Sequence, residues 1–147
     1  MKVYAFVGPS GTGKSYKALE VAYENDIKYI IDDGLLIHKN KIIAGISAKQ
    51  ANTTMEAVKR AIFNDYIHRE NVKTKIIEQK IDKILVLGTS NKMINQIVEK
   101  LELGEIYRII NISEVSTQEE INIARKSRKT GNHIIPVPTM EIKPIAS

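Results

Sequence analysis

A stretch near the start of the chain has the composition and spacing of a phosphate-binding loop. Residues 8–15 read Gly-Pro-Ser-Gly-Thr-Gly-Lys-Ser, which fits the pattern G-x-x-x-x-G-K-[ST]. Glycines let the backbone turn tightly and approach phosphate oxygens without a Cβ in the way. The amide groups of such a loop form an anion-binding nest, and a helix that begins directly after it adds partial positive charge. The pattern therefore predicts binding of the phosphates of a nucleoside triphosphate.

The two polar side chains that end this loop have separate expected tasks. Lys14 can reach the β- and γ-phosphates of a bound nucleotide, and Ser15 can place its hydroxyl on Mg²⁺. The loop is preceded by an apolar run and followed by a helical pattern, which is the context that the motif requires. The residues expected to bind the nucleotide are Gly8, Pro9, Ser10, Gly11, Thr12, Gly13, Lys14, Ser15 and Tyr16.

Two acids follow the next apolar run and are the candidate partners of the metal. The segment 28–33 reads Lys-Tyr-Ile-Ile-Asp-Asp, like a Walker B segment. Asp32 and Asp33 could hold magnesium through water, or act as a base on an acceptor hydroxyl. With Lys14 they form the predicted catalytic set, and with Ser15 the predicted metal set. The alternative is that Asp33 and Gly34 simply make a turn.

On these residues the sequence resembles the P-loop NTPase superfamily. The resemblance implies a nucleotide bound at the carboxyl ends of the strands, together with magnesium. The early position of the acids makes the chain partly similar to small-molecule kinases of the shikimate and gluconate type. It departs from that pattern because no arginine-rich lid is found and because an apolar hairpin pattern follows Gly34.

ATP is preferred to GTP as the expected nucleotide. A guanine-reading motif, [NT]-K-x-D, should follow a late strand. The segment 91–94 reads Asn-Lys-Met-Ile, so Ile94 stands where an aspartate is needed. The D-x-x-G pattern is also missing at the second strand, because Leu35 occupies its glycine position.

Weaker signals lie further along the chain. Thr89 ends an apolar strand and could sense the γ-phosphate, although the neighbouring Ser90 and Asn91 equally suit a helix cap. Arg125 and Arg128 could stabilise charge in the transition state, or merely complement the end of a helix. A loop and the helix after it could hold a second substrate through Ser47, Lys49, Gln50, Arg60 and Arg69.

The elements that must position these residues alternate along the chain. Apolar runs predict strands at 2–7, 27–31, 83–87, 106–110 and 133–137, and 35–37 with 41–43 suggests a small hairpin. Helical patterns follow at 14–24, 53–70, 72–80, 91–103 and 117–129. This order predicts an α/β P-loop sandwich of three layers, with about five mainly parallel strands and helices on both faces.

Length and composition set the broad class. The chain has 147 residues, a net charge of +5 and no cysteine, and it lacks the run of about 18 apolar residues that crosses a membrane. We expect a nucleotide-binding domain over 1–138 and a tail over 139–147, in a cytoplasmic protein. The lysines are dispersed among acids, so a nucleic-acid partner is predicted to be unlikely and a protein partner is allowed.

Three functions are compatible with these patterns. The first is a regulatory or switch-like ATPase that binds Mg·ATP. The second is a small-molecule or nucleotide kinase that transfers the γ-phosphate of ATP. The third is a non-catalytic nucleotide-binding or nucleic-acid-associated module. The sequence leaves the acceptor and the oligomeric state open.

Overall fold

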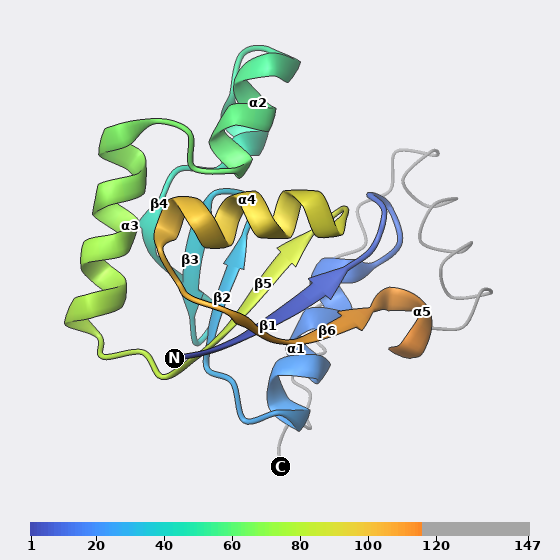
Figure 1. The fold of residues 1–147 in the computed structure, drawn as a ribbon. Helices are drawn as coiled ribbons and strands as arrows, with labels where there is room; N and C mark the ends of the chain where they lie inside the picture. Colours follow the sequence, from blue (N-terminus) through green and yellow to red (C-terminus); the bar gives the residue numbers. More distant parts are fainter. Residues whose placement is uncertain (116–147) are drawn as a thin grey trace.

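The apolar run before the phosphate-binding loop forms an inner strand of a mixed sheet, which has six strands over the described residues (Figure 1). The computed structural model describes residues 1–115. In chain order the elements are β1 (Lys2–Val7), α1 (Lys14–Glu24), β2 (Tyr29–Asp32), β3 (Leu35–His38), β4 (Lys41–Gly45), the 3₁₀ turn η1 (Ala48–Gln50), α2 (Thr54–Ala61), α3 (Tyr66–Glu78), β5 (Lys83–Gly88), α4 (Asn91–Leu101), β6 (Ile106–Asn111) and α5 (Ile112–Val115).

The strand order is β4-β3-β2-β5-β1-β6. The four strands β2, β5, β1 and β6 are parallel, whereas β3 and β4 add to the edge in antiparallel fashion. The α/β class with helices on both faces is confirmed. The expectation of about five mainly parallel strands needs correction, because the sheet is mixed. The strand predicted at 133–137 and the helix predicted at 117–129 lie outside the described residues.

Two tight turns account for the antiparallel edge. Asp33 and Gly34 have φ of +58° and +82°, and Lys39 and Asn40 have φ of +54° and +64°. Positive φ at both central residues is the geometry of a type I′ hairpin turn, which reverses a strand onto its neighbour. The hairpin predicted around Lys39 is therefore confirmed. Asp33 and Gly34 do form the turn that was given above as the alternative, and this turn folds β3 back on β2, a pairing that was not predicted.

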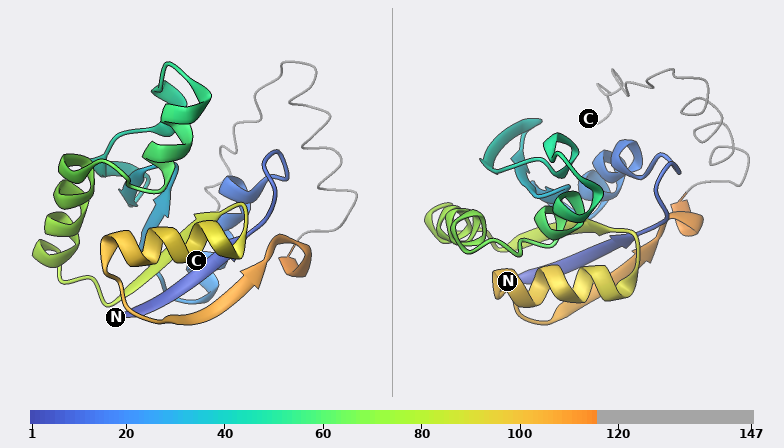
Figure 2. Two further views of the ribbon diagram at one scale, coloured as in Figure 1. Left: turned by 45° about the horizontal axis from the view of Figure 1, so that its top comes forward. Right: turned by 90° about the horizontal axis from the view of Figure 1, so that it is seen from above.

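The central strands are buried on both faces. In β5, Ile84 packs on the side of α3 and α4, whereas Leu85 packs on the side of α1. Figure 2 shows these helices on opposite sides of the sheet. Burial on both faces explains why β1 and β5 read as continuous apolar runs instead of alternating patterns.

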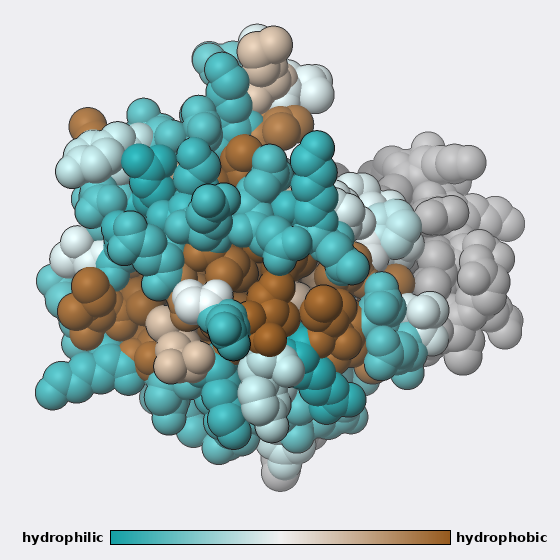
Figure 3. Space-filling view, viewed as in Figure 1, coloured by the Kyte–Doolittle hydropathy of each residue, from teal (hydrophilic) through white to brown (hydrophobic). Residues whose placement is uncertain are grey.

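Helix α4 is amphipathic, and it was predicted correctly from its spacing. It buries Ile94, Ile97, Val98 and Leu101 against the sheet. Its outer side is the hydrophilic row that crosses the middle of Figure 3, above a band of apolar surface.

The edge strand β6 contributes exposed apolar side chains, with Tyr107 59% and Ile109 43% exposed.

The helix predicted over 53–70 is in fact two helices. Helix α2 ends at Ala61, and α3 begins after Asp65, whose carboxylate accepts a hydrogen bond from the His68 backbone N–H at 3.0 Å. Between them Phe63 is fully buried and has φ of +59°. A right-handed helix cannot continue through a residue in the left-handed conformation, so the helix breaks at Phe63. Burial of the Phe63 ring outweighs the helical propensity of the segment.

Candidate functional site

The predicted phosphate-binding loop has a curved backbone that depends on glycine at two positions. Gly11 and Gly13 both have φ of +79°, a region that side chains disfavour. Between them Thr12 is buried, and its hydroxyl donates a hydrogen bond of 2.7 Å to the Pro9 carbonyl. The loop therefore holds its curved shape through its own contacts.

The loop joins β1 to α1 in the order that the motif requires. Lys14 donates from Nζ to the Gly8 carbonyl at 2.6 Å, so its ammonium is folded over the loop. A Cβ on Gly8 would lie 2.7 Å from Ile112 Cγ2, which shows how closely α5 packs beneath it. Ser15 is exposed at the first turn of α1.

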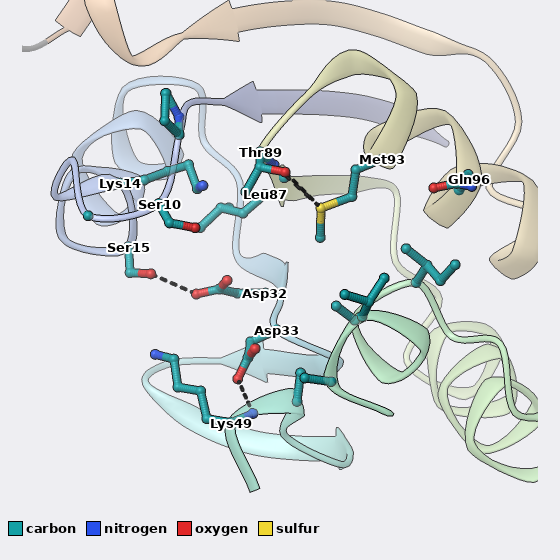
Figure 4. A pocket seen from close by; sticks show the side chains of 18 residues that line it. Ser10, Lys14, Ser15, Asp32, Asp33, Lys49, Leu87, Thr89, Met93 and Gln96 are labelled. Carbon is teal, nitrogen blue, oxygen red and sulfur yellow. Dashed lines mark hydrogen bonds between the residues drawn. The ribbon is translucent and has the colours of Figure 1, made fainter. Parts of the chain in front are cut away.

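A cavity of about 480 Å³ opens beside the loop, at the carboxyl ends of β1, β2 and β5 (Figure 4). A volume of this size suits a small-molecule ligand. Its polar and loop residues are Pro9, Ser10, Gly11, Lys14, Ser15, Asp32, Asp33, Ala48, Lys49, Gly88, Thr89 and Gln96. Its remaining lining is aliphatic or sulfur-containing, from Ala57, Val58, Ala61, Ile62, Leu87 and Met93.

The two neighbouring acids point to different partners. The Ser15 hydroxyl donates to Asp32 Oδ2 at 2.9 Å. Asp33 Oδ2 accepts from the Ser47 hydroxyl at 2.6 Å and from the Lys49 backbone N–H at 3.3 Å. Asp32 therefore faces the phosphate-binding loop, whereas Asp33 fastens the turn that carries η1 (Figure 4).

The environment of Asp32 disfavours its charged form. Burial raises the pKa of this carboxyl above its ordinary value of 3.8. The hydrogen bond from Ser15 and the charges of Lys49 and Lys14 act in the opposite direction, and the Asp33 charge adds to the increase. A carboxyl with a raised pKa that is close to a phosphate site is suited to accepting a proton.

Backbone contacts behind the acids admit only glycine at two positions. A Cβ on Gly34 would collide with the Ile46 carbonyl, and one on Gly45 would collide with the Gly34 carbonyl. The buried His68 ring lies against the same turn, with Nε2 2.8 Å from the Gly34 carbonyl oxygen. The spacing of the histidines gave no signal for this contact, because it joins residues 34 positions apart.

The other predicted residues are divided between the cavity and structural contacts. Thr89 lines the cavity, and its hydroxyl contacts Met93 Sδ at 3.5 Å. Arg60 donates to the Ser47 carbonyl at 3.0 Å, and Arg69 donates to backbone carbonyls at the break between α2 and α3.

Some predicted residues do not reach this site. Tyr16 is 38% exposed and is not part of the cavity lining, and Gln50 does not line it either. Arg125 and Arg128 lie outside the described residues. The aliphatic wall was not predicted, because the residue pattern of the short helix α2 does not show which of its sides faces the loop.

Oxygen donors for magnesium are present at one place. The Ser15 hydroxyl and the Asp32 carboxylate adjoin each other and the phosphate-binding loop, and magnesium prefers such hard oxygen ligands. Over residues 1–115 no group of three or more histidine, cysteine or acidic side chains is placed to hold a metal by itself. A metal here would thus depend on phosphate oxygens and water for most of its ligands. No helix in this part of the chain is long and apolar enough to span a membrane.

The relatives found for this chain all carry the name of one kind of enzyme. The chain is 31% identical over 119 residues to tRNA dimethylallyltransferases of Lactobacillus johnsonii and Lactobacillus gasseri, covering 71% of this chain and 37% of each relative. It is 27% identical over 149 residues to the tRNA dimethylallyltransferase of Mycoplasmoides gallisepticum, covering 84% of this chain and 47% of that relative. The chain thus spans less than half the length of these relatives. No family model matches it, and no solved structure matches it significantly.

These relatives correct one expectation and weaken another. A nucleic-acid partner was predicted to be unlikely, and this prediction is wrong because all three relatives are named for an activity on tRNA. Dispersed lysines were a poor guide, since a basic surface is formed by the fold and not by neighbours in sequence. The names describe group transfer and give no support to a regulatory ATPase.

Proposed function

We propose that this chain forms the diphosphate-binding part of an enzyme that transfers a dimethylallyl group to tRNA. The observation that carries the proposal is the cavity in which a phosphate-binding loop meets an aliphatic wall. The relatives' names supply the transferred group and the acceptor. Since the chain covers less than half of those relatives, the complete reaction and the acceptor are both part of the proposal.

A diphosphate ester is the ligand that matches both ends of this cavity. A dimethylallyl group must arrive on a carrier whose leaving group departs readily, and a diphosphate is such a group. Its oxygens would bind the backbone amides and Lys14 of the loop. The hydrocarbon would lie against Val58, Ile62 and Met93, which offer aliphatic surface and no aromatic ring for stacking a purine.

Asp32 is proposed as the group that accepts the proton released by the acceptor nucleophile. Its carboxylate lies beside Ser15 at the mouth of the loop, and its raised pKa makes it a stronger base than an ordinary aspartate. Asp33 is proposed to act indirectly, because its carboxylate is already engaged by Ser47 and Lys49.

Magnesium fits the oxygen donors of Ser15 and Asp32, with Ser15 as the direct ligand. A bound magnesium ion would neutralise charge on the departing diphosphate. The chain's own contribution is to orient the diphosphate along α1, with Lys14 reaching its terminal oxygens. Tight packing of Gly8 against Ile112 holds the start of the loop in place.

Phosphoryl transfer from Mg·ATP is the second candidate function. It is favoured by the same contact between Ser15 and Asp32, which would also place a metal and a base beside a γ-phosphate. The aliphatic wall favours the prenyl donor instead, because a phosphoryl acceptor with hydroxyl groups would gain little from it.

Calorimetry with magnesium distinguishes the two candidates. We expect dimethylallyl diphosphate to bind more tightly than inorganic pyrophosphate, and Lys14→Ala to abolish binding of both. Val58→Ser should reduce the difference between the two ligands while leaving pyrophosphate binding unchanged. Tighter binding of ATP than of dimethylallyl diphosphate would favour the kinase. If a folded protein bound none of these ligands, the proposed function would be wrong.

A further inference from the structure

Lys49 is a second cation in the cavity wall that the phosphate-binding motif does not include. Its side chain is exposed and lines the same cavity as Lys14. The two lysines enter from opposite sides in Figure 4, with Ser15 and Asp32 between them. A ligand held by the loop would therefore face Lys49 across the cavity.

The backbone of Lys49 is held in place by the second acid of the Asp pair. The Lys49 N–H donates to Asp33 Oδ2 at 3.3 Å and to Ser47 Oγ at 3.1 Å, and the Ser47 hydroxyl donates to Asp33 at 2.6 Å. The Ala48 N–H also donates to the Asp33 carbonyl at 2.9 Å. A carboxylate at the end of β2 thus fixes the 3₁₀ turn that presents Lys49.

The same turn is joined to the aliphatic wall. Arg60 of α2 donates to the Ser47 carbonyl at 3.0 Å. Since α2 also carries Val58, the turn that presents Lys49 is fastened to an element of the aliphatic wall. A diphosphate ester whose hydrocarbon lay on that wall would have its carbon-bound phosphate on the side of the cavity that this turn lines.

The ammonium of Lys49 lies near the site without being tied to one partner. Its positive charge acts on Asp32, in opposition to the effect of burial on that carboxyl. Over the described residues it makes no ion pair within 4.0 Å. A lysine on a flexible four-carbon stem can therefore turn from Asp32 to an anionic ligand.

We propose that Lys49 is a diphosphate-binding residue that contacts the phosphate next to the transferred group, opposite Lys14. This inference rests on the proposed function. Lys14 and the loop amides hold the terminal phosphate, and Lys49 holds the one attached to carbon. The transferred group and the leaving group are thereby separated at a fixed position in the cavity.

The chemistry gives this contact a role in transfer as well as in binding. The bond between the allylic carbon and the ester oxygen of the adjacent phosphate breaks, and its electron pair stays on that oxygen. The acceptor nucleophile forms the new bond to carbon with its own lone pair and loses a proton to Asp32. An ammonium group beside the phosphate that was attached to carbon stabilises the negative charge that the departing diphosphate gains.

Binding of two inorganic anions to the full chain, with magnesium, tests the proposal. Lys49→Ala should weaken pyrophosphate binding by about 10-fold or more, the usual effect of losing a hydrogen bond between charged groups. Binding of orthophosphate, which the loop alone can hold, should change little. Lys49→Arg should restore most of the affinity for pyrophosphate.

Lys41→Ala is the matched control, because it removes one exposed lysine from β4 outside the cavity. It should leave both affinities unchanged, and all variants should unfold at the wild-type midpoint. Wild-type affinity for pyrophosphate in Lys49→Ala, with binding lost in Lys14→Ala, would overturn the role of Lys49 and leave the proposed function standing. Equal weakening of orthophosphate and pyrophosphate would also overturn it. Failure of the wild-type chain to bind pyrophosphate would overturn both.

Discussion

At the scale of single residues, two adjacent aspartates have different surroundings and therefore different expected tasks. Asp32 receives a hydrogen bond from Ser15 and faces the loop, whereas Asp33 receives two from the turn at Ser47. Successive side chains of a strand point to opposite faces of the sheet, which separates these two carboxylates. The positive φ of Asp33 turns its side chain further away from that of Asp32. Spacing alone could not distinguish them.

Asp32→Asn should change the pH dependence of stability in a defined direction. The fold raises the pKa of Asp32, so ionisation costs more in the folded chain than in the unfolded chain. Stability of the wild type relative to Asp32→Asn should therefore fall as pH rises above 3.8, and should level off above the folded-state pKa. Urea unfolding of both proteins across this range measures the difference. A difference that grew in favour of the wild type would contradict the raised pKa.

At the scale of elements, the site depends on the Asp33–Gly34 turn, the end of β4 and a 3₁₀ turn, which contact one another behind the acids. Gly34 and Gly45 approach so closely that neither admits a Cβ, and His68 of α3 closes the contact from the other side. These contacts decide where Asp32, Asp33 and Lys49 lie. The sheet edge is therefore part of the site's support.

Gly34→Ala should destabilise the protein more than Gly104→Ala. Both glycines have positive φ, so an alanine pays about 1–2 kcal/mol of backbone strain at either position. At Gly34 the new Cβ also meets the Ile46 carbonyl, whereas at Gly104 nothing lies within 4 Å. We expect Gly34→Ala to cost about 3 kcal/mol or more. Equal losses for the two variants, measured by chemical unfolding, would show that the close contact is unimportant.

At the scale of the whole molecule, one sheet joins two apolar cores. The cluster on the α3 and α4 side and the cluster on the α1 side share β1 and β5, whose residues alternate between them. The phosphate-binding loop leaves β1 between the two clusters. Its position thus depends on both sides of the sheet being packed.

Truncation of either of two neighbouring residues in β5 tests this shared dependence. Ile84 and Leu85 are both 0% exposed and face opposite clusters. Ile84→Ala and Leu85→Ala should each lower the free energy of unfolding by about 2–5 kcal/mol, in a single cooperative transition. Two separate transitions in either variant, seen by circular dichroism during urea unfolding, would mean that the two faces fold independently.

The sequence by itself determined the order of strand, glycine-rich loop and helix around residues 8–15, the α/β class and most helices and strands. These features depend on local rules: glycines at fixed positions, apolar runs of strand length, and helical spacing. Helix α1 begins at Lys14 as predicted, and β5 and α4 follow the expected order. Such signals are readable because each is complete within a short segment.

The tertiary structure alone decided which residues surround the loop. Packing between segments distant in sequence determines three features: the antiparallel pairing of β3 with β2, the helix break at Phe63 and the position of α2. They bring Lys49 and an aliphatic wall to the phosphate-binding loop and assign Arg60 to a backbone contact. A ligand binds to the three-dimensional arrangement of these side chains. That arrangement exists only in the folded chain, because burial and contacts across the sheet determine it.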